Sequence, residues 1–254
     1  MSTSANPPPA YQAIPTSEST VPTGGDDIPD DFKFGTVVAQ CDRDIRHAFI
    51  RKVYSILTGQ LLLTTVFCSL FLFNTTIQVW VFQHLWTMYV GVAVTFISLL
   101  GLLWKRRSYP TNFILLTIFT ISEAYTLGFV VSLHEVHLVL QALLLTLGLF
   151  LALTLFAIQS RYDFSQWGSI LSFGLWGLIL VGLVQIFLPF NRTFDLVMAI
   201  GTAILFCGYI LYDTHLIQHR LSPEEYIVAA VDLYLDIVNL FLAILRILSD
   251  SQNN

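Results

Sequence analysis

The chain has 254 residues, of which 55% are hydrophobic and only 11% are charged, against roughly 25% charged residues in an ordinary soluble domain. Twelve of the charged residues lie in the first 52 positions, so the rest of the chain has too little charge to present a surface to water. A net charge of −5 excludes a basic surface for nucleic acid, and three scattered cysteines exclude a disulfide framework. Most of the chain must therefore be surrounded by lipid.

The first 40 residues differ from the remainder. They are rich in Pro, Ser, Thr and Asp and lack apolar runs, which predicts a disordered cytosolic tail (residues 1–40) ahead of a membrane domain (residues 41–254). Pro8, Pro9 and Tyr11 match the Pro-Pro-x-Tyr pattern that WW domains bind in the polyproline II conformation. One hypothesis is that the tail recruits a WW-domain ubiquitin ligase that sorts membrane proteins. The other interpretation is a plain Pro-rich spacer.

Seven apolar runs follow the tail, each of about the 20 residues needed to cross a ~30 Å hydrocarbon layer. Only helices and closed barrels satisfy their backbone hydrogen bonds in lipid, and these runs are too long and too continuously apolar for barrel strands. The sequence predicts an all-α integral membrane protein, a seven-transmembrane-helix bundle with short connections. The predicted spans are Val53–Phe73, Leu85–Leu103, Asn112–Leu133, Leu138–Ile158, Gly168–Leu188, Leu196–Ile217 and Tyr226–Leu248.

Lysine and arginine are distributed unevenly between the two sides of this bundle. They cluster before the first span and after the second, fourth and sixth, whereas the opposite loops hold only Arg192. The positive-inside rule then places the N-terminus in the cytosol. Seven complete spans would put the C-terminus on the far side, and a re-entrant seventh run would return it to the cytosol. Two glycosylation sequons, at Asn74 and Asn191, fall in loops assigned to the far side.

The last apolar run carries small and polar side chains at alternating spacings of three and four, which places them on one face of a helix. Carboxyl groups are costly in lipid, so this face must contact other helices or water inside the bundle. The last helix is therefore expected to be central. The alternative is that Asp232 lies near the membrane interface and Asn239 only supports packing. The stripe comprises Ala229, Asp232, Asp236, Asn239, Ala243 and Arg246.

Two further acids, Glu123 and Asp213, lie within predicted spans. Asp213 is about one turn from the cytosolic end of the sixth run, so it can approach the acids of the antiparallel seventh run. Two carboxyl groups in one site cannot both ionise cheaply, so one keeps its proton and the pair titrates as a unit. Such a pair also offers oxygen ligands for Ca²⁺. The alternative is two independent, half-solvated acids. Depth alone places Asp213 level with Asp232. Glu123 is either protonated and hydrogen-bonded or lines a water path.

His215 and His219 are four residues apart at the predicted cytosolic end of the sixth run. This spacing occurs in metal sites. Histidines at a helix C-terminus more often complement the helix dipole, and we favour that interpretation.

Two segments of the chain carry a resemblance to a known family. The first is Gly-Tyr-Ile-Leu-Tyr-Asp-Thr at Gly208–Thr214, and the second extends from Glu225 through Leu-Tyr-Leu-Asp-Ile-Val-Asn-Leu-Phe at Leu233–Phe241. With the basic stretch Arg46–Tyr54 ahead of the first span, the chain resembles the transmembrane Bax inhibitor motif family, most closely its lifeguard branch. The likeness extends to Leu248 and leaves out the tail.

The resemblance implies a seven-helix fold with a central last helix and a passive, pH-sensitive Ca²⁺ leak from an internal store. It implies no enzymatic activity and no cofactor, with Ca²⁺ as the transported ion, and it implies that the protein restrains cell death and endoplasmic reticulum stress signalling, with cell-death regulators as partners. The implied location is the endoplasmic reticulum, Golgi or vacuolar membrane. The family's paired aspartates correspond to Asp213 and Asp236, where Ca²⁺ could bind. Asp232 departs from the family pattern and would be a third acid that alters the pair's proton affinity.

Two other functions compete with the leak. An intramembrane aspartyl protease also uses two membrane aspartates, one of them after a tyrosine, as Asp213 follows Tyr212. Its second motif is Gly-x-Gly-Asp, and the residues here are Leu233-Tyr234-Leu235-Asp236, which argues against it. A non-transporting regulator that acts by binding other membrane proteins is the main alternative.

Overall fold

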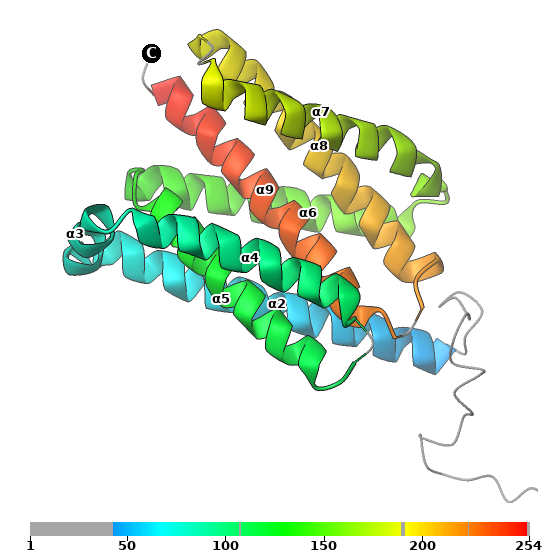
Figure 1. Ribbon diagram of the computed structural model, residues 1–254. Helices are drawn as coiled ribbons and strands as arrows, with labels where there is room; N and C mark the ends of the chain where they lie inside the picture. The colour runs from blue at the N-terminus through cyan, green and yellow to red at the C-terminus, as the bar shows by residue number, and fades with distance from the viewer. Residues whose placement is uncertain (1–42, 107, 189–190, 223, 253–254) are drawn as a thin grey trace, which may run out of the picture.

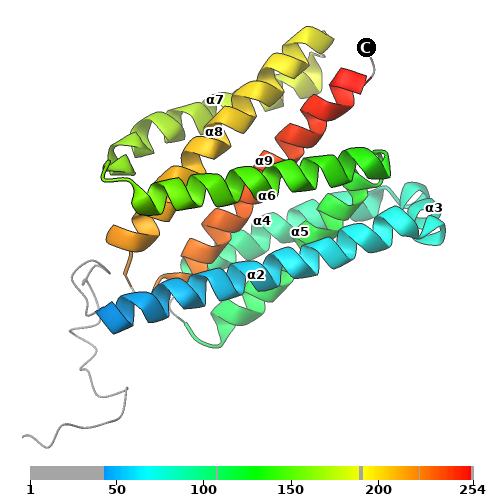
Figure 2. The same cartoon turned by 180° about the vertical axis from the view of Figure 1, so that it is seen from behind.

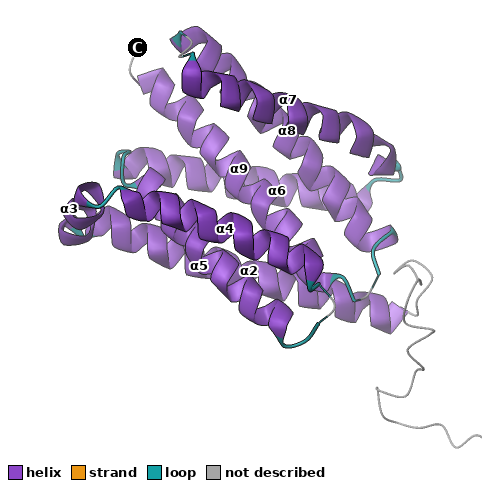
Figure 3. Cartoon of the chain, viewed as in Figure 1, coloured by secondary structure: helices purple, strands orange, loops and turns teal. Residues whose placement is uncertain are grey.

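The computed structural model describes residues 43–252 except for 107, 189–190 and 223. Within this range the chain forms helices and no strand, as Figure 3 shows, which confirms the all-α prediction. The predicted tail, with Pro8, Pro9 and Tyr11, lies outside the described residues.

Seven of the helices are long and apolar enough to cross a membrane, as the sequence predicted. The last has 27 residues, or roughly 40 Å at the rise of an α-helix, which is the length of a complete span. A short helix, α3, and a 3₁₀ turn, η2, complete the described elements. The helices are α2 (Arg43–Phe73), α3 (Thr75–Gln83), α4 (Trp86–Trp104), α5 (Thr111–Val131), α6 (Val136–Gln159), η2 (Phe164–Trp167), α7 (Gly168–Phe187), α8 (Arg192–His219) and α9 (Tyr226–Gln252).

The first span begins ten residues earlier than predicted, at Arg43 rather than Val53. The predicted boundary followed hydropathy, and residues 43–52 contain several charges. These residues are nevertheless helical, and Phe49 is buried in the main core beside Val53. The basic side chains can therefore extend away from the helix while Phe49 anchors it.

Helix α3 was not predicted, because it is too short to appear as a span. Asn74 caps it, accepting hydrogen bonds at Oδ1 from the backbone N–H groups of Thr76 and Ile77. Val81 secures the helix in a small cluster with Phe71 and Phe129. The first sequon thus has a structural role as a helix N-cap.

The second sequon has the same role. Asn191 accepts a hydrogen bond from the backbone N–H of Phe194 and caps α8. An asparagine at an N-cap stabilises a helix whether or not a sugar is attached. Capping therefore accounts for both asparagines without glycosylation.

Helix α9 is the most buried of the seven candidate spans. Figures 1 and 2 show it crossing between α7 and α8 on one side and α2, α4 and α5 on the other, with α6 running across it. It packs against α8, α2, α6 and α5. Of its most apolar stretch 72% is buried, against 50% for α5 and 6% for the span that contains α7. The residues of α9 are therefore buried against protein more than those of any other span.

Candidate functional site: a carboxyl pair between α8 and α9

The structure brings Asp213 of α8 within hydrogen-bonding reach of Asp236 of α9. Asp236 is only 5% exposed, and Asp213 is half-buried. Among the residues that the structure describes, no group hydrogen-bonds the Oδ2 atom of Asp236. Two carboxyl groups in contact inside a bundle repel each other when both are ionised. The arrangement therefore favours one proton shared between them.

The packing of α8 on α9 fixes this pair. The two helices are antiparallel and in contact along their length. At the ends away from their connecting loop, Arg246 of α9 binds Asp195 of α8 at 3.2 Å, and Arg192 of α8 forms an ion pair with Asp250 of α9. The two helices are thus held together by ion pairs at one end and by a short loop at the other, with the carboxyl pair between.

The polar stripe on α9 was expected to lie inside the bundle, but only part of it does. Asp236 is buried, but Asp232, one turn nearer the start of α9, is exposed. Asp232 still lies close enough to Asp213 and Asp236 for their charges to interact. Asn239 donates a hydrogen bond to the carbonyl of Leu235 in its own helix at 2.8 Å, so it does not bind the carboxyl pair.

Glu123 is at a separate place. It is half-buried on α5, and its carboxyl group lies beside the Thr95 hydroxyl of α4. Glu123 interacts through its charge with Tyr234 of α9, whose hydroxyl is hydrogen-bonded to Thr64 at 2.8 Å. Glu123 therefore lies beside Thr95 and apart from the Asp213–Asp236 pair, and the two options for its role stay predictions.

Of the two histidines near the end of α8, His215 contacts the connection between α6 and α7. His215 Nε2 lies 3.0 Å from Asp163 Oδ1, and the rings of His215 and His219 are stacked with centroids 4.5 Å apart. Arg220 adds a hydrogen bond to Ser165 at 3.0 Å and an ion pair to Asp163 at 3.6 Å. In the described part of the chain, no three His, Cys, Asp or Glu side chains form a metal-binding group.

Asp163 was missed by the sequence reasoning. It is the N-cap of η2 and accepts a hydrogen bond from the backbone N–H of Ser165. The Asp-x-Ser pattern before a helix was the available signal, but its partners on α8 are some 50 residues away and could not be read locally. Hydrogen bonds from Ser165, and then the charges of His215 and Arg220, lower the pKa of Asp163.

Asp163→Asn should weaken the contact that holds the connection between α6 and α7 against the end of α8. A carboxyl whose pKa is lowered on folding stabilises the fold above its ordinary pKa and loses that effect only as the pH falls through the lowered value. The Asp163 carboxylate should therefore stay ionised from neutral to mildly acidic pH. Trypsin should cleave the purified variant after Arg161 several-fold faster than the wild type at neutral pH. Glu135→Gln, an exposed loop acid at the other end of α6, is the matched control, and equal cleavage rates in all three proteins would show that Asp163 holds nothing.

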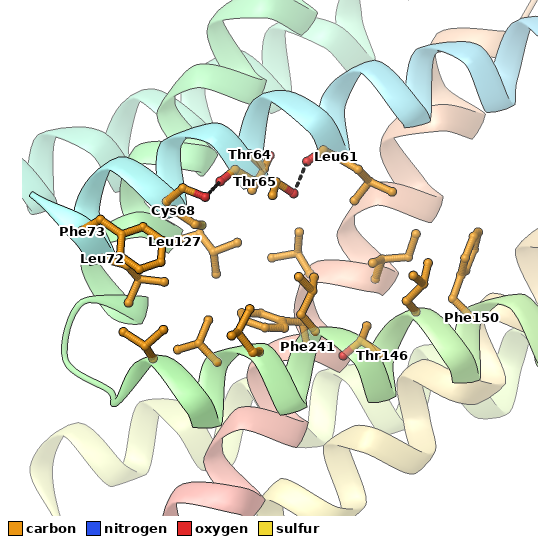
Figure 4. Close-up of a pocket in the computed structure, with 18 residues that line it drawn as sticks. Leu61, Thr64, Thr65, Cys68, Leu72, Phe73, Leu127, Thr146, Phe150 and Phe241 are labelled. Atoms are coloured by element: carbon orange, nitrogen blue, oxygen red, sulfur yellow. Dashed lines mark hydrogen bonds between the residues drawn. The ribbon is translucent and has the colours of Figure 1, made fainter.

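A separate apolar cavity of about 170 Å³ lies between α2, α6 and α9 (Figure 4). Leu127, Phe150 and Phe241 contribute to its wall, and the acids of the pair do not. The hydroxyls of Thr64 and Thr65 in that wall donate to carbonyls of their own helix. No residue that lines this cavity carries a carboxylate, the ligand that Ca²⁺ prefers. The carboxyl pair, and not this cavity, is the candidate site for ion chemistry.

Comparison with known proteins identifies the family to which the chain belongs. The model of the family described as "Inhibitor of apoptosis-promoting Bax1" matches residues 46–254. The chain belongs to the Bax inhibitor family. It is 43% identical over 250 residues to Bax inhibitor 1 of Schizosaccharomyces pombe, covering 98% of this chain and 92% of that protein. The resemblance inferred from the two aspartate motifs is therefore confirmed.

Relatives with other names fall within the same Bax inhibitor family. Protein lifeguard 4 of Mus musculus is 45% identical over 221 residues, covering 87% of this chain and 92% of that protein. The Golgi anti-apoptotic protein of vaccinia virus is 46% identical over 228 residues, covering 88% and 94%. Both matches extend over most of each chain, so they concern the whole bundle and not one motif.

Proposed function

We propose that this Bax inhibitor family member mediates a pH-sensitive Ca²⁺ leak from an internal store and thereby restrains cell death and endoplasmic reticulum stress signalling. The observation that carries the proposal is the contact between Asp213 and Asp236 inside a membrane-spanning bundle. The names of relatives, an anti-apoptotic protein among them, support the cell-death role.

Protonation of the carboxyl pair would change its affinity for Ca²⁺. Carboxylate oxygens are the ligands that Ca²⁺ prefers, and a carboxyl group that holds a proton loses much of its affinity for a cation. A change of pH therefore changes the charge that a passing Ca²⁺ meets at Asp213 and Asp236. In this account Ca²⁺ is the transported ion, and the protein is neither an enzyme nor dependent on a bound cofactor.

Reconstitution tests the proposal. Purified full-length protein is placed in liposomes that contain Ca²⁺, and efflux is followed with a Ca²⁺-sensitive dye at a series of pH values. The proposal requires efflux above that of protein-free vesicles, with a rate that changes with pH. Absence of efflux at every pH would instead favour a non-transporting regulator that acts by binding other membrane proteins, including cell-death regulators.

We further propose a cytosolic N-terminus and residence in the endoplasmic reticulum, with the Golgi or a vacuolar membrane as further locations. Basic residues support the orientation, because Arg46 and Arg51 lie near the N-terminal end of α2 and Arg106 and Arg220 lie in connections on the same side. Protease added to sealed microsomes should remove the N-terminal tail. A tail protected from protease would reverse the orientation of every loop.

We also propose that the tail binds a WW-domain ubiquitin ligase through Pro8, Pro9 and Tyr11. Proline limits the entropy lost when a short peptide docks, so such a motif can bind measurably. Lys33 of the tail and Lys52 at the start of α2 are the nearby acceptors. Tyr11→Ala should lengthen the half-life of the protein and shift its location in cells, without changing Ca²⁺ efflux from liposomes. An unchanged half-life and location would identify the segment as a spacer.

A further inference from the structure

The apolar cavity between α2, α6 and α9 takes no part in the proposed ion chemistry. Its volume is about 170 Å³, and leucine, valine, isoleucine and phenylalanine side chains form most of its wall (Figure 4). An engineered cavity of about 150 Å³ with such a wall stays free of water and binds benzene. The space between α2, α6 and α9 is therefore large enough for about six carbon atoms of an apolar ligand.

The polar side chains in the wall offer little to water. Four of them donate the hydroxyl hydrogen to the carbonyl four residues earlier in the same helix, namely Thr64, Thr65, Ser69 and Thr146. Thr64 is also hydrogen-bonded to the hydroxyl of Tyr234 on α9 at 2.8 Å. Of the described side chains in the wall, no hydroxyl keeps a free hydrogen. Because a buried water needs two to four polar partners, the cavity suits hydrocarbon better than water.

The cavity opens towards lipid between α2 and α6. Each of these helices packs against α9, but they make little contact with each other. Several wall residues along this opening are exposed, namely Phe73 on α2 and Leu140, Leu143 and Leu147 on α6. Both helices are long and apolar enough to cross a membrane. The medium that meets the opening is therefore the hydrocarbon of the bilayer.

The inner wall of the cavity belongs to α9. Ile237, Val238 and Phe241 contribute to it, and they are 8%, 3% and 7% exposed. All three lie near the middle of α9 (Tyr226–Gln252), and therefore near the middle of the membrane. A lipid chain on the outer surface of the bundle would not reach these side chains, whereas a chain inside the cavity would touch them.

The cavity is long and narrow. Its wall on α2 extends from Leu61 to Phe73, which is roughly 18 Å of helix, and one leaflet of the hydrocarbon core is about 15 Å deep. Phe73 ends α2 and Val136 begins α6, and both contribute to the wall. The space thus extends from one membrane surface towards the midplane, as an acyl chain does. A volume of about 170 Å³ over this length has the width of one chain rather than of a fused-ring sterol.

We propose that this cavity binds one acyl chain of a bilayer phospholipid, inserted between α2 and α6 with its methyl end against α9. The headgroup of that phospholipid stays at the membrane surface beside the end of α2. The chain supplies the van der Waals contacts that the side chains of the wall would otherwise lack. This site does not depend on the proposed Ca²⁺ leak.

Photolabelling of the wild type tests the site. Full-length protein is reconstituted with phosphatidylcholine that carries a diazirine near the methyl end of one chain, and labelled residues are located by mass spectrometry after illumination and digestion. The label should appear on α9 between Ile237 and Phe241, in addition to exposed residues of α6 such as Leu144. The same lipid with the diazirine beside the headgroup is the matched probe, and it should leave this part of α9 unlabelled.

Two results with the wild type would overturn the proposal. One is a label confined to exposed residues with both lipids, since no chain would then enter the bundle. The other is labelling of Ile237–Phe241 by a diazirine-bearing sterol and not by the acyl probe, since the occupant would then be a sterol.

Filling the cavity provides a second test. Val139 of α6 is 5% exposed and contributes to the wall, so Val139→Phe places a ring where the chain would lie. This variant should lose the label on α9 and keep the label on the outer face of α6. Leu144→Phe, at a position that is 68% exposed on that outer face, is the matched control and should keep both labels. Undiminished labelling of α9 in Val139→Phe would contradict the proposal.

Ca²⁺ efflux from the same liposomes separates this site from the proposed function. Labelling of α9 by the acyl probe without efflux would refute the leak and leave the acyl-chain site standing. Efflux without labelling of α9 would do the reverse.

Discussion

Asp213→Asn and Asp236→Asn should each abolish the pH response of Ca²⁺ efflux from liposomes. Asparagine keeps the shape of the side chain but can neither bind a proton in this range nor carry the charge. Because Asp213 and Asp236 are in contact, removing either acid leaves the other without the partner that makes it share a proton. A titrating site changes a rate by at most about tenfold per pH unit, and in each variant the profile should become flat.

The control for these variants is Asp44→Asn. Asp44 is an exposed acid in the first turn of α2 and lies away from the pair. This variant should retain the wild-type pH profile. If both pair variants also retain it, the two acids do not control the leak. Asp232→Asn should shift the midpoint of the profile without flattening it, since Asp232 interacts with the pair through its charge alone.

Ala230→Leu should destabilise the bundle by about 1–3 kcal/mol, the usual cost of inserting methylene groups into a well-packed core. Ala230 is 0% exposed on α9, the helix that packs against α2, α5, α6 and α8. Small residues at such positions let membrane helices approach closely, and leucine would force α9 away from its neighbours. Thermal unfolding of the purified protein in detergent measures the loss.

Ala152→Leu is the matched control for this substitution. Ala152 lies on α6 but is exposed, so the added side chain would enter lipid or detergent rather than the core. Its unfolding temperature should equal that of the wild type. Similar losses in both variants would mean that the effect belongs to leucine itself and not to the packing of α9.

The seven spans were predictable because lipid imposes a minimum length on each apolar run, and run lengths are visible in sequence. Helix α3 was not, since it depends on the cap at Asn74 and on the contact of Val81 with Phe71 and Phe129, which only the fold brings together. The early start of α2 at Arg43 was hidden for a related reason. The charged residues of this segment lower its mean hydropathy, so it does not appear as part of an apolar run, although Phe49 within it is buried.

The candidate site was predictable in its identity but not in its geometry. The spacing on α9 indicated a polar face, and the family motifs selected Asp213 and Asp236. Depth along the helices favoured Asp232 as the partner, because helix ends are uncertain by about a turn. The crossing of α8 and α9 decides between the two acids, and a crossing depends on side-chain packing that no local pattern encodes.

The central claim, that Asp213 and Asp236 act as one proton-sharing unit that controls Ca²⁺ efflux, is tested most directly by a double-mutant cycle. Wild type, the two single asparagine variants and the double variant are reconstituted at equal density, and efflux is measured across the same pH series. The account predicts that the double variant has the same flat profile as either single variant, because removing the second member of a broken pair removes nothing further. Single variants that each keep a titration of their own, with losses that add in the double variant, would contradict it.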